Sequence, residues 1–358
     1  MPLIIGGGPA GAAAAIMLAR GGAKPIVLER HGGDHDALCG GFLSWNTLDK
    51  LRALGIDPAG LDGHVVGQVR LFAGDRSAEF PLPAPGLGLS RRTLDHALLA
   101  EAERAGADVR RGVIVRSIEG DNVRLGNGGT MTADAILLAV GKHDLRGAAR
   151  PPAGNDPAMG LRWRFRADPR LTQIIAGAVE LHLFDHGYAG LVMQEYGHAN
   201  LCLAIRRSGF ARVGQRPEAV LAALIAEQPA LHERLADAQI GEAQAIANVP
   251  YGWRATASDT NGLYRIGDQA GVIPSLAGEG VGIALVSGIA AARAVIEGAS
   301  PTAFQDALSG TLRRPIVTAS LLWHAAERSP IARKAMPVIT RLPGLVDRAM
   351  RMTRSEPC

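Results

Sequence analysis

The sequence predicts an α/β fold in which a parallel sheet carries an inserted antiparallel sheet and is followed by a helical C-terminal segment. Three observations predict it. Residues 3–29 place two apolar strand-like segments around a glycine-rich turn and a helix of small residues. Residues 156–250 alternate apolar and polar side chains with the period of two that is typical of strands. Residues 301–358 have a helical pattern in which prolines recur.

The composition indicates a folded chain with room for about two domains. The 358 residues are 47% hydrophobic and include 38 Lys and Arg against 34 Asp and Glu, which excludes a disordered protein. Three cysteines are too few for a disulfide scaffold or for the four thiolates of an iron–sulfur cluster. No apolar stretch reaches the ~18–20 uncharged residues of a membrane span. The chain starts directly with a strand, so we expect no signal peptide and a cytoplasmic location.

The sharpest local signal is the unit of strand, turn, helix and strand at residues 3–29. Gly6, Gly8 and Gly11 form G-x-G-x-x-G between the first strand and the helix, and Glu29 ends the second strand 18 residues after Gly11. The first glycine allows the tight turn, the second allows close approach of a pyrophosphate, and the third lets the helix pack against the sheet. The helix N-terminus attracts phosphate, and an acid at this distance binds a ribose hydroxyl. The unit predicts an adenine dinucleotide site.

Shorter elements follow. A turn at Cys39-Gly40-Gly41 precedes a helix that ends near residue 54, and the prolines at 81, 83 and 85 indicate short edge strands within residues 64–90. A helix begins after Arg91, and a buried strand at 135–140 stops at Gly141. After the insertion at 156–250, the chain returns to the first sheet at Gly267-Asp268. A second helix of small residues begins at Gly280.

The C-terminal segment is basic. Residues 311–358 contain nine Arg and Lys against three Asp and Glu, whereas the rest of the chain has 29 against 31. A body that is slightly acidic and poor in aromatic residues argues against nucleic-acid binding. The prolines at 315, 330, 337 and 343 are expected to break this segment into short helices. Three interpretations stay open, namely a packed helix with a solvated face, a lid over a substrate tunnel, and peripheral contact with an anionic membrane.

Residues 262–295 resemble the second FAD motif of the flavoproteins built like para-hydroxybenzoate hydroxylase. Within that class, the pattern GD-x-A-G…P…GEG…A…SG is most similar to the geranylgeranyl reductase branch. The CGG at 39–41, the R-x-x-L-D at 91–95, the AVG at 139–141 and the GYAG…N at 187–200 agree with it. The resemblance covers most of residues 3–298. It implies a discontinuous FAD-binding domain of the glutathione reductase 2 and hydroxylase type.

This resemblance assigns roles to particular residues. Asp268 would hold the ribityl chain, with an N-terminal helix cap as its alternative role, and Arg91 would reach the phosphates. Residues 274–280 would run along the isoalloxazine, where the positive end of the following helix stabilises the negative charge of a reduced flavin. The complete set of expected cofactor-binding residues is Gly6, Gly8, Pro9, Ala10, Gly11, Glu29, Arg30, Gly40, Gly41, Arg91, Gly141, Gly267, Asp268, Pro274, Gly278, Glu279, Gly280 and Val281.

Three departures from the class limit what the resemblance implies. The Asp-Gly pair that aromatic hydroxylases carry after this strand is replaced by Val140-Gly141, so direct reduction by NADPH is in doubt. The Trp-x-Trp-x-Ile-Pro motif and the lysine of flavin halogenases are absent. The aromatic segment of the reductases reads Gly-Tyr-Ala-Gly-Leu-Val-Met at 187–193, so the substrate need not be an isoprenoid. A second G-x-G-x-x-G unit is also missing. Electrons are therefore expected from transiently docked NAD(P)H or from a partner reductase.

Cys39 is the one candidate catalytic residue. The matching cysteine of the reductases lies beside flavin and substrate, and the alternative is a buried thiol packed under the ring. His182 and His186 flank Asp185 but lack a second cluster of ligands, so no metal site is predicted. The expected partner is a hydrophobic small molecule. A reductase is a further partner if it supplies the electrons, and the inner face of a membrane is one if the basic C-terminal segment lies on it. The oligomeric state is left open.

The predicted domains follow from these assignments. Residues 1–63, 88–155 and 251–300 form a discontinuous FAD-binding domain. Residues 64–87 and 156–250 form a substrate-binding domain, and 301–358 form the C-terminal helical segment. The leading hypothesis is flavin hydride transfer to or from a C–C bond of a hydrophobic small molecule. The alternatives are a monooxygenase that hydroxylates an aromatic or polyketide-like metabolite and a non-catalytic flavin-binding protein.

Overall fold

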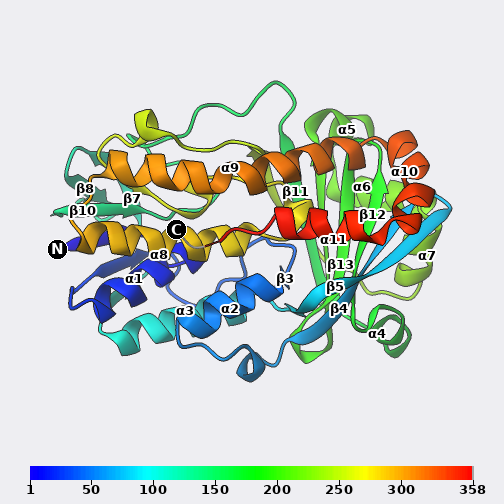
Figure 1. Ribbon diagram of the computed structural model, residues 1–358, viewed down its shortest axis with the longest axis horizontal. Helices are drawn as coiled ribbons and strands as arrows, with labels where there is room; N and C mark the ends of the chain where they lie inside the picture. The colour runs from blue at the N-terminus through cyan, green and yellow to red at the C-terminus, as the bar shows by residue number, and fades with distance from the viewer. Residues whose placement is uncertain (357–358) are drawn as a thin grey trace.

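The computed structural model describes residues 1–356 and places two sheets side by side along the long axis of the molecule (Figure 1). The first sheet is parallel, with strand order β16-β10-β1-β2-β6. In chain order its strands are β1 (Pro2–Ile5), β2 (Ile26–Glu29), β6 (Asp108–Arg111), β10 (Ala135–Leu138) and β16 (Tyr264–Arg265). Leu3, Ile4 and Ile5 are at most 2% exposed, as expected for a parallel strand covered on both faces.

The two faces of this sheet are covered differently. Ile4 and its neighbours pack against helices α1 (Pro9–Arg20), α3 (Arg91–Ala105) and α8 (Gly280–Ile296). Leu3 and Ile5 pack against a small antiparallel sheet. That sheet consists of β7 (Val115–Glu119), β8 (Asn122–Leu125) and β9 (Thr130–Thr132). Helices α1 and α8 pack so closely at Gly288 that a Cβ there would stand 2.2 Å from the carbonyl oxygen of Ala10. Only glycine fits at this contact.

The second sheet has eight strands in the order β15-β11-β14-β13-β12-β4-β5-β3. Its neighbours are antiparallel except β12 and β4. The strands are β3 (Phe42–Leu43), β4 (His64–Ala73), β5 (Arg76–Gly88), β11 (Ala158–Arg166), β12 (Ala178–Phe184), β13 (Gly187–Met193), β14 (His198–Arg206) and β15 (Gln244–Val249). This sheet therefore joins a hairpin from residues 64–88 to strands from the insertion, and it also takes β3 from the preceding loop.

Alternation along the strands gives this sheet two different faces. Leu161, Trp163 and Phe165 of β11 join a buried apolar core with four short helices. These helices are α4 (Pro169–Ile175), α5 (Arg207–Arg212), α6 (Pro217–Glu227) and α7 (Pro229–Leu235). Arg162 and Arg164, between those apolar residues, point to the opposite face. That face looks toward the first sheet and carries the candidate site.

The prediction of short edge strands at residues 64–90 was wrong for the length of both strands and for the position of β4, and it is confirmed only for the edge position of the prolines on β5. Strands β4 and β5 are 10 and 13 residues long, and β4 lies inside the sheet between β12 and β5. The prolines lie on β5, whose outer edge pairs with only two residues of β3. A proline that faces an unpaired edge costs the sheet no hydrogen bond, so it does not shorten the strand.

The C-terminal segment forms helices α9 (Pro301–Ala326), α10 (Ser329–Arg341) and α11 (Pro343–Met352), together with helix α2 (Trp45–Ala53) beside its end. The expected break at Pro315 is wrong, because α9 continues through it, and α10 likewise contains Pro337. An interior proline costs a helix ~3 kcal/mol. Burial of Leu308, Leu312 and Ile316 on α9 outweighs that cost. Among the helices of residues 1–356, none is long and apolar enough to cross a membrane.

Candidate active site

The glycine-rich turn presents open backbone to the space above the first sheet. Gly6 has φ +106°, and a Cβ there would lie 2.4 Å from the carbonyl oxygen of Ala139. A Cβ at Gly11 would lie 1.9 Å from the carbonyl oxygen of Gly6. Gly8 is the N-cap of α1, and a Cβ there would meet only Arg91 Nη2, at 3.2 Å. Gly6 and Gly11 are thus fixed by the turn itself, whereas Gly8 keeps clear the space in front of the helix N-terminus, where an anion binds.

Glu29 at the end of β2 is held by the same turn. Its Oε2 accepts a hydrogen bond of 2.7 Å from the Gly7 amide, and its Oε1 accepts one of 2.9 Å from the His31 amide. A carboxylate has about four lone-pair sites, so acceptors remain for a ribose diol. The carboxylate is therefore positioned before any ligand arrives.

Two ion pairs lie farther along this space. Arg91 donates two hydrogen bonds of 2.8 Å to the Asp95 carboxylate. Burial alone would lower the pKa of Arg91, but the charge and hydrogen bonds of Asp95 raise it above its ordinary value. Lys142 Nζ lies 3.1 Å from Asp268 Oδ2, and this carboxylate raises the pKa of Lys142. Arg150 donates to the main-chain oxygens of both Asp268 and Lys142. The loop after β10 is thereby tied to the segment that carries Asp268.

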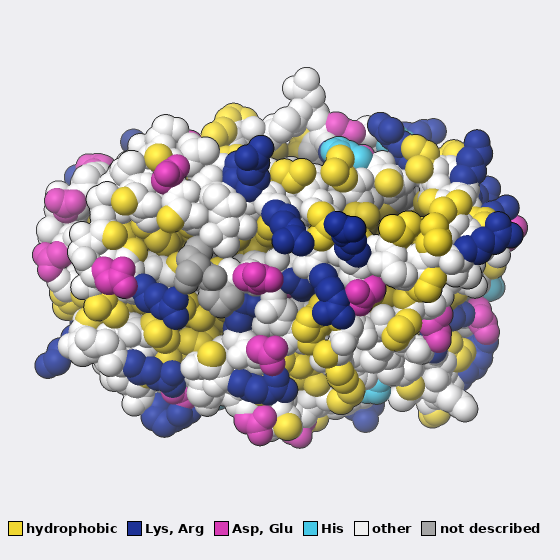
Figure 2. Space-filling model, viewed as in Figure 1, with side chains coloured by type: hydrophobic (Ala, Val, Ile, Leu, Met, Phe, Trp, Pro, Cys, Tyr) yellow, Lys and Arg dark blue, Asp and Glu magenta, His cyan; other side chains and the backbone are white. Residues whose placement is uncertain are grey.

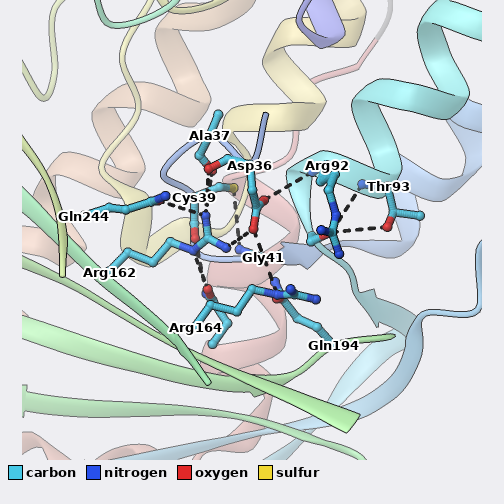
Figure 3. Close-up of polar contacts among 12 residues, drawn as sticks. Asp36, Ala37, Cys39, Gly41, Arg92, Thr93, Arg162, Arg164, Gln194 and Gln244 are labelled. Atoms are coloured by element: carbon cyan, nitrogen blue, oxygen red, sulfur yellow. Dashed lines mark hydrogen bonds and ion pairs between the residues drawn. The ribbon is translucent and has the colours of Figure 1, made fainter. Parts of the chain in front are cut away.

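A buried polar network fixes the loop at residues 36–41 (Figure 3). Arg162 Nε donates to Asn200 Oδ1 at 2.7 Å, and its two terminal nitrogens reach the Asp36 carboxylate and main-chain oxygens of residues 36 and 37. Asn200 Nδ2 in turn donates to the main-chain oxygens of Cys39 and Gly40, at 3.2 and 2.8 Å. The antiparallel sheet therefore sets the position of the CGG turn. Nearby Arg164 continues the network to Gln194 and Glu195.

Loss of this network should cost considerable stability. Arg162→Gln leaves the Asp36 carboxylate without its guanidinium, and breaking a buried ion pair costs about 3 kcal/mol. We expect that loss in the free energy of unfolding, measured by urea denaturation. Arg166→Gln removes an exposed arginine from the same strand and face and should change the free energy by at most about 0.5 kcal/mol. Equal effects of the two substitutions would contradict the role given to Arg162.

Cys39 lies on the wall of this space and is partly buried, with its Sγ 3.5 Å from the Gly41 amide nitrogen. Cys202 of β14 lines the same space but is buried, and that burial raises the pKa of its thiol to about 12. A thiol with so high a pKa is protonated at neutral pH and does not act as a nucleophile. Of the two cysteines, Cys39 stays the candidate for a role in the reaction.

These features line one continuous cavity of about 1580 Å³. A site for a single small molecule typically measures ~300–1000 Å³, so this cavity has room for a dinucleotide and a second molecule. Fifteen of the predicted cofactor-binding residues lie on its wall. They are Gly6, Gly8, Pro9, Ala10, Glu29, Arg30, Gly40, Gly41, Arg91, Gly141, Gly267, Asp268, Gly278, Gly280 and Val281.

Gly11, Pro274 and Glu279 do not line the cavity. The fully buried Glu279 side chain binds the end of the chain instead. Its carboxylate accepts hydrogen bonds from Ser44 Oγ at 3.1 Å, Arg354 Nη1 at 2.6 Å and Ser355 Oγ at 2.8 Å. Arg354 Nη2 also donates to the carbonyl oxygen of Ala277. The segment after α11 is therefore anchored on the turn that precedes α8.

Removal of this anchor should loosen α11. Arg354→Gln deletes charged hydrogen bonds worth about 1.5–3 kcal/mol each, so the amides of α11 should exchange with deuterium at least roughly tenfold faster. The control is Arg351→Gln, because Arg351 forms only an exposed i,i+4 pair with Asp347, which solvent screens. Unchanged exchange in Arg354→Gln would show that packing alone holds α11.

The half of the cavity beyond Gly41 is apolar. Val69 and Leu71 of β4 and Val179 and Leu181 of β12 form its floor. Its roof comes from the three C-terminal helices. The roof residues are Ala319, Leu322, Ala325, Ala326, Ile331, Ala332, Ala335, Met336, Ile339, Leu345, Val346, Ala349 and Met350. Residues far apart in the sequence thus enclose one apolar chamber.

A hydroxyl cluster stands where the two halves of the cavity meet. Tyr188 Oη donates to Ser275 Oγ at 2.7 Å, and Tyr251 Oη lies 2.5 Å from the same oxygen. Trp323 contacts both tyrosine rings edge-on, at 5.9 and 5.5 Å between centroids. Burial raises the pKa of Tyr251 and raises that of Tyr188 well above the ordinary value. Both phenols therefore stay protonated at neutral pH.

Sequence reasoning missed Arg162, Arg164 and Tyr251 as residues of this region, whereas Ser275 lies in the segment 274–280 that was expected beside the flavin. The alternating arginines on β11 are typical of a solvated strand face, and only the packing of the loop over them makes them internal. Trp163 and Phe165, on the opposite face, were the available signal that this strand is central. No local pattern marks Tyr251.

The residues of the first half fit FAD. Gly8 leaves the front of the α1 N-terminus open for a pyrophosphate, and Glu29 offers acceptors for a ribose. The cavity continues from there past Asp268 to Gly278, Gly280 and Val281 at the N-terminus of α8. A helix N-terminus there suits the N1 region of a reduced flavin.

The comparisons with known proteins agree with this fit. Residues 2–125 match the family described as FAD binding domain. The FAD-dependent monooxygenase OpS4 of Beauveria bassiana is 32% identical over 173 residues, which are 43% of this chain and 40% of OpS4. A menaquinone reductase of Mycolicibacterium smegmatis is 24% identical over 94% of this chain and 89% of its own length. The chloroplastic geranylgeranyl diphosphate reductase of Arabidopsis thaliana is 26% identical over 82% of this chain and 65% of its own length.

Only part of some relatives is matched. The chain spans 40% of the length of OpS4 and of a Mycobacterium tuberculosis menaquinone reductase.

Solved structures agree over the whole fold. The flavin-dependent brominase Bmp2 superimposes with a TM-score of 0.76 at 18% identity, covering 99% of this chain and 94% of Bmp2. The halogenase PltM in complex with phloroglucinol and FAD superimposes with a TM-score of 0.74 at 14% identity, covering 99% of this chain and 88% of PltM. Residues 2–125 therefore form an FAD-binding domain, and the whole chain has the fold of these flavin-dependent enzymes.

Proposed function

We propose that the chain reduces a carbon–carbon double bond of a hydrophobic small molecule. The observation that carries this proposal is the juxtaposition of an apolar chamber with the Tyr251–Ser275–Tyr188 hydroxyl cluster at the flavin end of the cavity. Bound FAD would supply the hydride chemistry, because a reduced flavin can transfer a hydride, which is two electrons and one proton, to carbon. The residues of this chain must then bind the substrate, exclude water and provide a proton.

The chamber explains binding. Its wall consists of leucine, isoleucine, valine, methionine and alanine side chains from the second sheet and from α9–α11. Apolar surface buried there contributes roughly 25 cal/mol per Å², so a long hydrocarbon chain binds without directional contacts. The roof of three helices excludes water from the reacting carbon. Water would otherwise weaken the electrostatic interactions around that carbon.

The hydroxyl cluster supplies the proton that the reaction needs. Saturation of a double bond adds a hydride to one carbon and a proton to its neighbour. Tyr188 donates to Ser275, and Ser275 can donate to Tyr251, which leaves the Tyr251 hydroxyl hydrogen free for the cavity. Burial keeps that phenol protonated by raising its pKa. A positioned acid of this kind contributes ~10²–10⁴-fold to a proton-transfer step.

The relatives support a reductive reaction on an isoprenoid chain. Two curated relatives that align with more than four fifths of this chain are a menaquinone reductase and a geranylgeranyl diphosphate reductase. Menaquinone and geranylgeranyl diphosphate both contain unsaturated isoprenoid chains. Such chains match the apolar chamber.

A monooxygenase that hydroxylates an aromatic metabolite is the second candidate. OpS4 is named as a monooxygenase, and the structural neighbours include PqsL of Pseudomonas aeruginosa, described as a probable FAD-dependent monooxygenase. The same Tyr251–Ser275 hydroxyls could hydrogen-bond a phenol. Fold is shared by both reaction types, so fold alone does not separate them.

The products separate the two candidates. Holoenzyme reduced with dithionite is mixed with geranylgeraniol, which has no quinone ring to oxidise flavin nonspecifically, once without oxygen and once with ¹⁸O₂. We expect a product heavier by two hydrogens in both vessels and no ¹⁸O. Product that forms only with oxygen and carries ¹⁸O would replace this proposal with the monooxygenase.

A further inference from the structure

We propose that the outer surface of helices α9–α11 docks on an anionic lipid bilayer and opens the chamber toward it. Seven of the twelve large hydrophobic side chains that are exposed on residues 1–356 lie in this segment. They are Val317, Leu321, Leu322, Ile331, Val338, Leu342 and Leu345. We call them the tail patch. Figure 2 shows such side chains gathered with dark blue Lys and Arg over the area where Figure 1 places these helices.

The three helices present the patch in register. Ile331, Lys334 and Val338 of α10 and Leu342, which caps it, follow one another at spacings of three and four, which puts them on one stripe. Ala332 and Met336, on the opposite side of α10, are buried against the second sheet and the chamber. The helix is therefore apolar on two sides, and packing within the molecule accounts for only one of them.

The same stripe recurs on the other helices. Arg314, Val317 and Leu321 are exposed at i, i+3 and i+7 on α9, and Leu345 and Arg348 are exposed at i and i+3 on α11. Each stripe thus mixes apolar side chains with a cation. Within the described residues, Arg314, Lys334 and Arg341 form no ion pair with an acid, so their charges are available to a partner.

Charge identifies the partner as an anionic lipid surface. Residues 311–358 contain nine Arg and Lys against three Asp and Glu, whereas the rest of the chain is slightly acidic. Basic amphipathic helices lie in the plane of the interface, with apolar side chains among the acyl chains and cations at the headgroups. None of the described helices is of the length and hydropathy that a span requires, so the contact is peripheral.

The position of the patch connects it to the site. Leu322, Ile331 and Leu345 are between 38% and 53% exposed and also line the cavity, so the patch forms the rim of the chamber. A hydrophobic molecule dissolved in the bilayer would then enter between α9, α10 and α11 without passing through water. This inference goes beyond the reaction itself.

The test is vesicle co-sedimentation of the full-length holoenzyme without substrate, so its outcome is independent of the reaction. One set of vesicles contains phosphatidylcholine alone and the other contains added phosphatidylserine. We expect binding to the anionic vesicles that weakens with salt. The triple variant Arg314→Gln, Lys334→Gln and Arg341→Gln should lower the affinity by about a hundredfold, from ~1 kcal/mol for each cation at the surface.

Matched control variants separate the effect of the tail patch from a general loss of positive charge. Arg116→Gln, Arg166→Gln and Arg216→Gln remove the same charge from exposed positions elsewhere and should lower the affinity by no more than about threefold. Val338→Asp should lower it strongly, whereas Val65→Asp, at another exposed valine, should not.

Three results would overturn the proposal. The first is an absence of binding to anionic vesicles. The second is an equal loss of affinity for anionic vesicles in the tail variants and in their controls, which would indicate nonspecific electrostatic attraction. The third is a lipid-free dimer that Val338→Asp dissociates, which would assign the patch to a second copy of the chain. Circular dichroism of each variant verifies that it is folded.

Discussion

Tyr251→Phe should slow the oxidation of the reduced flavin by substrate about 100-fold while FAD binding stays unchanged. The substitution removes the hydroxyl that faces Ser275 and the cavity but keeps the ring that packs on Trp323. The measurement is anaerobic stopped-flow of holoenzyme reduced beforehand. Tyr196→Phe is the matched control, because Tyr196 is 61% exposed and does not line the cavity.

The pH dependence of this step distinguishes a proton donor from a structural hydroxyl. Burial raises the pKa of Tyr251, and an acid donates its proton only below its pKa. The wild-type rate should therefore hold through pH 10.0, the ordinary tyrosine pKa, and fall only above it. The residual rate of Tyr251→Phe should lack that alkaline decrease. A variant that keeps the wild-type rate and pH profile would exclude Tyr251 as the donor.

Gly8→Val should abolish FAD binding. A Cβ at this position fits beside Arg91, at 3.2 Å, but valine adds two methyl groups at the mouth of the α1 N-terminus. They occupy the space that a pyrophosphate needs, and β-branching also disfavours the close approach of phosphate to backbone amides. The purified variant should be colourless, and titration with FAD should give no saturable change in flavin fluorescence.

The control for this variant is Gly154→Val. A Cβ at Gly154 meets nothing within 4 Å, and this loop lies outside the cavity wall. Gly154→Val should therefore be yellow and bind FAD like the wild type. A flavin-saturated Gly8→Val protein would contradict the placement of the pyrophosphate at this turn.

The glycine-rich turn on the cavity wall could be predicted because its determinants are local. The Gly6–Gly11 turn, the small-residue helix and Glu29 are close in sequence, and each is required by backbone geometry that a printed sequence reveals. The pattern GDxAG…GEG likewise located Asp268 and Gly280 on the cavity wall. Glu279 shows the limit of such patterns, since its side chain binds Arg354, which lies 75 residues away.

The substrate half could not be predicted in the same way because it depends on contacts between distant segments. Arg162 becomes internal only when the loop with Asp36 closes over β11, 126 residues away in sequence. Tyr251 and Tyr188 come together at Ser275 from three separate segments. Pro315 predicts the end of a helix, but tertiary packing of α9 prevails over local propensity.

The most direct test of the proposed reduction is whether substrate alone oxidises the reduced flavin. Holoenzyme is reduced with dithionite, freed of excess reductant and mixed anaerobically with geranylgeraniol or squalene in detergent, while the flavin absorbance is followed. We predict that oxidised FAD returns in a single turnover with at least one of these molecules and that Tyr251→Phe slows its return. Flavin that stays reduced with both molecules until oxygen and a phenolic substrate are added would contradict the proposed reduction and leave the monooxygenase.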